Sequence, residues 1–84
     1  MKFEYDEKKS QINKEKHNID FVEAQNLWQD ENALVVPANV IDGETRYALI
    51  SKILTKCFVA IFTLREDAKN GANRTLMTLL FGHL

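Results

Sequence analysis

The sequence has little cysteine, proline, glycine or histidine, and each shortage narrows the kinds of protein it can encode. A single cysteine, Cys57, excludes an internal disulfide and any zinc site built on several thiolates. With three glycines and one proline, the chain contains no glycine-rich phosphate loop. His17 and His83 are the only histidines, and neither has a partner at metal-ligand spacing. We therefore expect no cofactor and no metal ion.

Long apolar segments are also missing. The opening residues, MKFEYDEKKS, place acids where the apolar part of a secretory signal would lie. The longest apolar stretch, residues 75–82, is much shorter than the roughly 20 residues that a bilayer-spanning helix needs. We expect a cytoplasmic protein with no membrane contact.

The residues that are present are typical of one small folded domain over residues 1–84. Hydrophobic residues make up 45% of the chain, which argues against disorder. Charge is divided unevenly, because residues 1–32 hold five lysines against eight acids and residues 33–84 hold six lysines or arginines against four acids. The second part could therefore face a polyanion.

Two helices are predicted near the start of the chain. Asp6 is a suitable N-cap for a polar helix over EKKSQINKEKH, and Asn18 suits its left-handed end. Asp20 and Glu23 have the spacing of a capping box for a second helix. Apolar residues on one face of that helix follow: Phe21, Ala24, Leu27 and Trp28.

Strand patterns surround these helices. KFEY is a short strand candidate, and ALVVPANV, TRYALISKI and KCFVAIFTL predict three more strands, with Asp42-Gly43 as a turn. Pro37 places the first of the three at an edge or at a bulge. KCFVAIFTL is apolar on both faces, which predicts a central strand covered on both sides, with Cys57 buried. REDAKNGAN is expected to be a loop. The fold class is α+β: a strand, two helices and an antiparallel three-stranded meander.

The tail GANRTLMTLLFGHL, residues 71–84, is mostly small or apolar. Leaving it in water would cost about 25 cal/mol per Å² of apolar surface. We expect residues 74–80 to form an extra strand that covers the edge of the sheet.

Cations on the meander are the main chemical feature of the chain. Arg46, Lys52, Lys56 and Arg65 come from adjacent strands and could converge on one phosphate, to which arginine can bond in a bidentate way.

A family resemblance gives this feature a context. KFEYDEKKSQINKEKHNIDFVEAQNLWQDENALVV closely resembles the opening of BrnT-type toxins, and RYALISKI and AIFTLR look like the hairpin strands of that family, the second ending in Thr-x-Arg. The similarity covers roughly residues 2–66. It implies a RelE-like fold and an RNA-cleaving toxin of a type II toxin–antitoxin system, held inactive by a ribbon-helix-helix antitoxin of BrnA type. DNA would be contacted only through the antitoxin complex.

The resemblance also suggests which residues act on RNA without a metal. Arg65 and Thr63 match the Thr-x-Arg motif, and Arg46 matches the arginine that begins the first hairpin strand. Lys56 near a turn and His17 as a general acid or base complete the catalytic candidates. Each has a plainer interpretation: edge protection for Arg46 and Lys56, a capped strand end for Arg65, strand propensity for Thr63, and a helix-dipole contact for His17.

The tail departs from the family, which continues with an Ile-Ile-Ser-x-Arg strand and a basic helix. NGANRTLMTLLFGHL matches neither, which predicts a divergent tail over residues 67–84, from truncation or a changed reading frame after about residue 66. Two alternatives to an active ribonuclease remain. One is an inactive relic that folds and still binds antitoxin. The other is an unrelated interaction domain with an apolar dimer surface.

Overall fold

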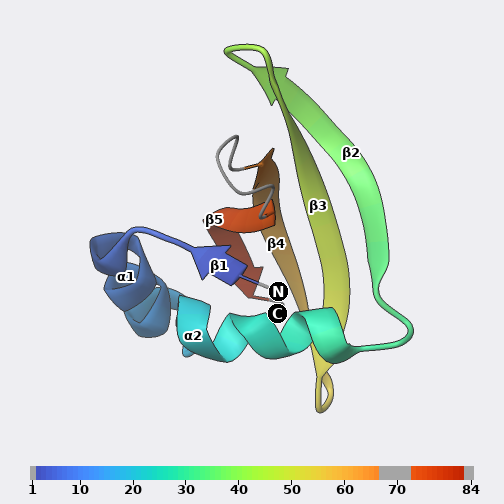
Figure 1. Cartoon of the computed structure of the whole chain (residues 1–84). Coiled ribbons are helices and arrows are strands. Elements are labelled where there is room, and N and C mark those ends of the chain that lie inside the picture. Colours follow the sequence, from blue (N-terminus) through green and yellow to red (C-terminus); the bar gives the residue numbers. More distant parts are fainter. Residues whose placement is uncertain (1, 67–72, 83–84) are drawn as a thin grey trace.

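A computed structural model describes residues 2–66 and 73–82, in which helices lie against one face of a twisted sheet (Figure 1). The fold is α+β, as predicted. The elements, in chain order, are β1 (Lys2–Glu4), α1 (Glu7–His17), α2 (Phe21–Ala24), the 3₁₀ segment η1 (Gln25–Gln29), β2 (Leu34–Ile41), β3 (Glu44–Ile53), β4 (Lys56–Glu66) and β5 (Asn73–Gly82).

Side chains at the helix ends confirm the predicted caps. Asp6 accepts hydrogen bonds from the backbone N–H groups of Lys8 and Lys9, at 2.8 and 3.2 Å, and Asn18 ends α1 with φ 62°. Asp20 and Glu23 form the reciprocal bonds of a capping box at the start of α2. Asp6 and Asp20 fix where each helix begins because their carboxylates accept from backbone N–H groups that have no partner inside the helix.

The second helix differs from the prediction after its first turn. The α-helix ends at Ala24, and the chain continues as the 3₁₀ segment η1. Phe21, Ala24 and Leu27 are spaced by three and are all fully buried. A 3₁₀ turn has three residues, so this spacing keeps each of them directed at the sheet.

The sheet has five strands in the order β1-β5-β4-β3-β2. β2, β3 and β4 form the predicted antiparallel meander, with β2 at the edge. β4 extends to Glu66 and β5 begins at Asn73, so both ends of the predicted loop REDAKNGAN are strand, and its middle, residues 67–72, lies outside the described residues. The tail supplies β5, which runs antiparallel to β4 on one side and parallel to β1 on the other. β5 therefore lies inside the sheet, between β1 and β4.

The α1 helix covers the part of the β5 edge that β1 does not reach. β1 pairs only with residues 74–76, and the Asn13 side chain donates a 3.0 Å hydrogen bond to the Leu80 carbonyl further along. A Cβ added at Gly82 would lie 2.9 Å from the His17 Cβ, so helix and strand are in close contact there. This cover protects strand groups that would otherwise be unpaired.

The core lies between the helices and one face of the sheet. Trp28 meets Phe3 and Phe62 edge to face, with ring centroids 5.0 and 5.3 Å apart, and Tyr5 meets Phe21 at 5.7 Å. The buried apolar residues of this layer are Ile19, Phe21, Ala24, Leu27, Leu49, Phe58, Ala60, Phe62, Met77 and Leu80.

The opposite face of the sheet, named the open face below, is not covered by any described element. Val59 and Ile61 of the central strand are only partly buried, and Leu79 and Phe81 are 49% and 48% exposed. The expectation that β4 is covered on both sides is therefore wrong, because both helices lie on the same side. Cys57 is half-buried on the open face and not part of the core, another difference from the prediction.

Two β-bulges interrupt the sheet. In β2 the register passes from Pro37 to Asn39, leaving Ala38 without a partner on β3. In β5 the partners of Ile61 and Phe62 are Leu79 and Met77, so Thr78 is the extra residue. Its hydroxyl donates a 3.2 Å hydrogen bond to the Ile61 carbonyl. The bulge in β2 was among the predicted roles of Pro37, whereas nothing in the sequence indicated the second.

Candidate phosphate site and family

Arg46 and Thr63 form the centre of the candidate site on the open face. They are direct cross-strand partners on β3 and β4. Thr63 is only 2% exposed, and its hydroxyl oxygen has no hydrogen-bond partner among the described residues. The Arg46 Nε atom is buried and unpaired in the same way. Unpaired buried polar atoms are costly, and two of them side by side indicate a place for a polar ligand.

Arg65 and Arg74 extend this pair toward the far end of the sheet. They are register partners on β4 and β5, two residues along β4 from Thr63 and on the same face. We call Arg46, Thr63, Arg65 and Arg74 the arginine cluster.

Carboxylates engage two of the three arginines. Arg65 binds Glu44 with two hydrogen bonds of 3.1 and 3.2 Å, and Arg74 binds Glu4 at 2.5 Å. The bond from Arg65 lowers the pKa of Glu44 below its ordinary value, and the same contact raises the pKa of Arg65. Arg46 has no ion pair within the described residues, so it is the arginine most available to an anion.

The other two predicted residues lie at the opposite end of the sheet. Lys56 begins β4, seven residues from Thr63, a separation of about 23 Å along an extended strand. Together with His17, it lines a separate hollow of about 280 Å³ beside the β3–β4 turn. The structure thus brings Arg46, Thr63 and Arg65 together and places His17 and Lys56 away from them.

Two members of the site were not among the predicted residues. Arg74 lies in the tail, where no motif identifies it, and only the β4–β5 register shows that it faces Arg65. Glu44 follows the Asp42-Gly43 turn, and its place beside Arg65 could have been predicted by continuing the β3–β4 register beyond Arg46. The signal in the sequence was the opposite charge of Glu44 and Arg65, which this register places across from each other on neighbouring strands.

The described residues contain no group of three or more histidine, cysteine or acidic side chains that could hold a metal ion. Within the same residues, no helix has the length and apolar character needed to cross a membrane.

Comparison with known protein families identifies the family of this chain. Residues 5–74 match the model of the ribonuclease toxin BrnT of type II toxin–antitoxin systems. The chain belongs to the BrnT family. No curated protein matches the chain. All four residues of the arginine cluster lie within the BrnT match, whereas most of β5 follows it. Membership implies an RNA substrate and an antitoxin partner.

Proposed function

We propose that this BrnT-family chain is a metal-independent endoribonuclease that acts in the cytoplasm and binds the scissile phosphate at the arginine cluster. The observation that carries the proposal is the pair of unpaired buried groups, Arg46 Nε and the Thr63 hydroxyl, on neighbouring strands. A phosphate oxygen would give both groups the partner that they lack. Arg65 and Arg74 would then supply further positive charge on the same face.

Such a site suits cleavage by the RNA's own 2′-hydroxyl. The 2′ oxygen loses its proton to water and bonds to phosphorus, the bond from phosphorus to the 5′ oxygen breaks, and that oxygen takes a proton from water. Negative charge accumulates on the phosphorane between these events. Fixed guanidinium donors stabilise that charge without a metal ion, and this stabilisation is the contribution assigned to Arg46 and Arg65.

The proposed partner is a ribbon-helix-helix antitoxin of BrnA type, which would neutralise the toxin and contact DNA on behalf of the complex. Support for this partner comes from the resemblance of the sequence to BrnT-type toxins.

A second candidate function is that of an inactive relic that folds and still binds its antitoxin. One observation favours it, namely that Glu44 and Glu4 already occupy Arg65 and Arg74. An RNA phosphate would have to compete with these carboxylates, although both pairs are partly exposed and therefore weak.

The test is cleavage of a long single-stranded RNA by the purified chain in EDTA. We expect cleavage by the unchanged protein and at least about a tenfold loss in Arg46→Gln and in Arg65→Ala, since each removes a charge-assisted contact. Lys56→Ala is the matched control, because it removes a cation from the same strand at the distant end.

The outcomes separate the candidates. No cleavage by protein with a folded circular dichroism spectrum would support the relic. A loss in Lys56→Ala as large as in Arg46→Gln would contradict the placement of the site.

A further inference from the structure

We propose that the hollow beside Arg46 is a base-binding subsite, which takes one nucleobase of single-stranded RNA next to the phosphate held by the arginine cluster. This inference rests on the proposed function, because it adds a base to the phosphate assigned there.

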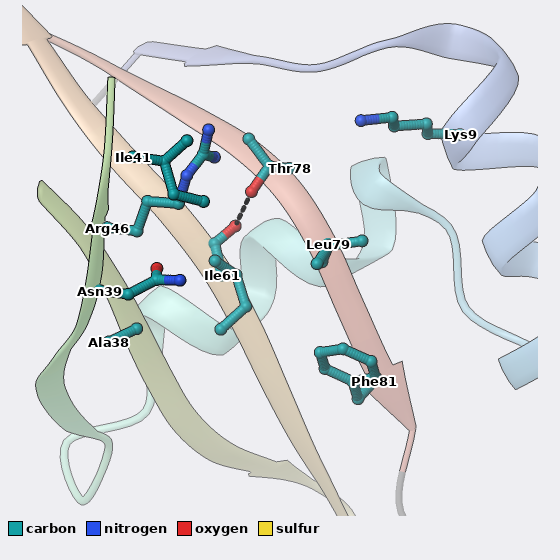
Figure 2. Close-up of a pocket in the computed structure, with 9 residues that line it drawn as sticks. All are labelled: Lys9, Ala38, Asn39, Ile41, Arg46, Ile61, Thr78, Leu79 and Phe81. Atoms are coloured by element: carbon teal, nitrogen blue, oxygen red, sulfur yellow. Dashed lines mark hydrogen bonds between the residues drawn. The ribbon is translucent and has the colours of Figure 1, made fainter. Parts of the chain in front are cut away.

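The hollow has a volume of about 510 Å³ and lies on the open face (Figure 2). Arg46 is a member of both the cluster and the wall, so the two sites are continuous. Figure 2 shows the Arg46 guanidinium at the Thr78 end and Phe81 further along β5. The lining residues are Lys9, Ala38, Asn39, Ile41, Arg46, Ile61, Thr78, Leu79 and Phe81.

Both bulges of the sheet fall on this hollow, one on each side. The extra residues, Ala38 of β2 and Thr78 of β5, are themselves part of its wall. A bulge bends a strand and changes the face to which the following side chains point. Bulges are also frequent beside binding sites, which makes their coincidence here informative.

The bulge at Thr78 creates the β5 wall. Without it, Leu79 would share a face with Met77, which is 1% exposed in the core. With the extra residue, Leu80 turns to the core and is 2% exposed, while Leu79 and Phe81 turn to the open face. Thr78, Leu79 and Phe81 all follow the residues that match the BrnT model, so this wall lies outside the matched part of the chain.

The chemistry of the wall suits a base. Ile41, Ile61 and Leu79 supply an apolar floor, and the half-exposed ring of Phe81 offers a stacking surface. The Asn39 side-chain amide can donate to or accept from a base edge. Aromatic stacking with a neighbouring cationic groove is the usual way in which proteins hold single-stranded nucleic acid.

A partner protein is the other class of ligand for an apolar surface. The base is favoured because the hollow opens onto Arg46, whose guanidinium suits a phosphate, and because Lys9 extends toward it from α1. An apolar surface and positively charged side chains thus lie close together in the hollow, just as a base and its neighbouring phosphates lie close together in RNA.

The test compares two labelled probes by fluorescence anisotropy at fixed salt: a short 2′-O-methyl RNA, which cannot be cleaved, and an abasic chain with the same number of phosphates. Phe81→Leu keeps an apolar side chain but removes the ring. A lost stack is worth ~1–3 kcal/mol per base, so we expect Kd for the RNA to rise roughly 5- to 150-fold. The abasic probe should bind this variant and the unchanged protein equally.

Two controls make the result specific. Leu34→Ala alters another exposed apolar residue that does not line this hollow, and it should change neither Kd. Arg46→Gln should weaken both probes. If Arg46→Gln changes neither, the phosphate site is wrong. The base subsite is wrong if Arg46→Gln acts as expected but Phe81→Leu leaves RNA binding unchanged, or weakens the binding of both probes equally. The apolar wall would then be a surface for a protein partner.

Discussion

Glu44 accepts two hydrogen bonds from the guanidinium of Arg65, from Nε at 3.1 Å and from a terminal nitrogen at 3.2 Å. The contact joins the ends of β3 and β4 on the open face. It is a bidentate contact, the kind that arginine also makes with a phosphate. The Glu44 carboxylate therefore occupies the two Arg65 donors on which the proposed phosphate contact would depend.

The pair predicts a dependence of stability on pH. Arg65 lowers the pKa of Glu44 from its ordinary value of 4.5, so the folded state favours the charged carboxylate. The stabilisation is fully present above pH 4.5 and is lost as the pH falls through the lower pKa of the folded state. Glu44→Gln should be less stable than the unchanged protein at pH 7, and the difference should shrink toward zero below pH 4.5. Urea unfolding across this range measures it.

The double variant Glu44→Gln/Arg65→Gln completes a mutant cycle for this pair. If the pair is the cause, the coupling between the two substitutions should disappear in acid and weaken in high salt, because both side chains are partly exposed. A coupling that is the same at pH 3 and pH 7 would refute the assignment.

The hydroxyl of Thr63 is expected to lower the stability of the protein and to support RNA cleavage. Its buried hydroxyl has no hydrogen-bond partner among the described residues, and Thr63→Val removes that hydroxyl while keeping a branched side chain. We expect the free energy of unfolding to rise by about 1 kcal/mol. RNA cleavage should fall about tenfold or more, since a hydrogen bond to the phosphate is lost. Thr63→Ser retains the hydroxyl and should retain cleavage. If Thr63→Val were less stable and fully active, the hydroxyl would have no role in the site.

Leu79 and Leu80 are adjacent on β5, but their side chains lie on opposite faces of the sheet. Truncating them should therefore change the stability of the protein by different amounts. Leu80 is 2% exposed and Leu79 is 49% exposed. Leu80→Ala should lower the free energy of unfolding by about 2–5 kcal/mol, whereas Leu79→Ala should change it by less than about 1 kcal/mol. Equal effects in urea unfolding would show that the bulge at Thr78 does not direct these side chains as described.

Removal of the whole tail is the stronger form of the same test. Deleting residues 71–84 removes β5, which among the described strands is the one that pairs with β1, and takes Met77 and Leu80 out of the core. We expect an unfolded or aggregated product. A dissolved deletion variant with an unchanged circular dichroism spectrum would show that the tail does not hold the sheet together.

Local signals in the sequence were enough to predict both ends of α1, the start of α2 and most strands. Asp6, Asn18 and Asp20 act within one turn of their own positions, and the Asp42-Gly43 turn has φ of 50° and 78° at its two residues. Pro37 correctly placed β2 at the edge with a bulge. Such features depend on a few adjacent residues, so they can be recognised without knowledge of the fold.

Features that depend on register could not be predicted in this way. No local pattern marks Thr78 as an extra residue, and its effect on Leu79 and Leu80 follows only from the pairing with β4. Which candidate site residues lie together also depends on the strand register. Lys56 and Arg65 share one strand, yet strand length separates them, whereas Arg46 and Thr63 are distant in sequence and adjacent across the β3–β4 ladder.

The position of β5 between β1 and β4 has a consequence for how the protein is made. Residues 2–4 leave the ribosome long before residues 74–76, their only strand partners in the described sheet. The first strand must therefore wait until residue 76 has been translated before it can pair with β5. Arg74 joins the other arginines at the same late moment. The nascent chain can therefore bring the four residues of the arginine cluster together only after β5 has been translated.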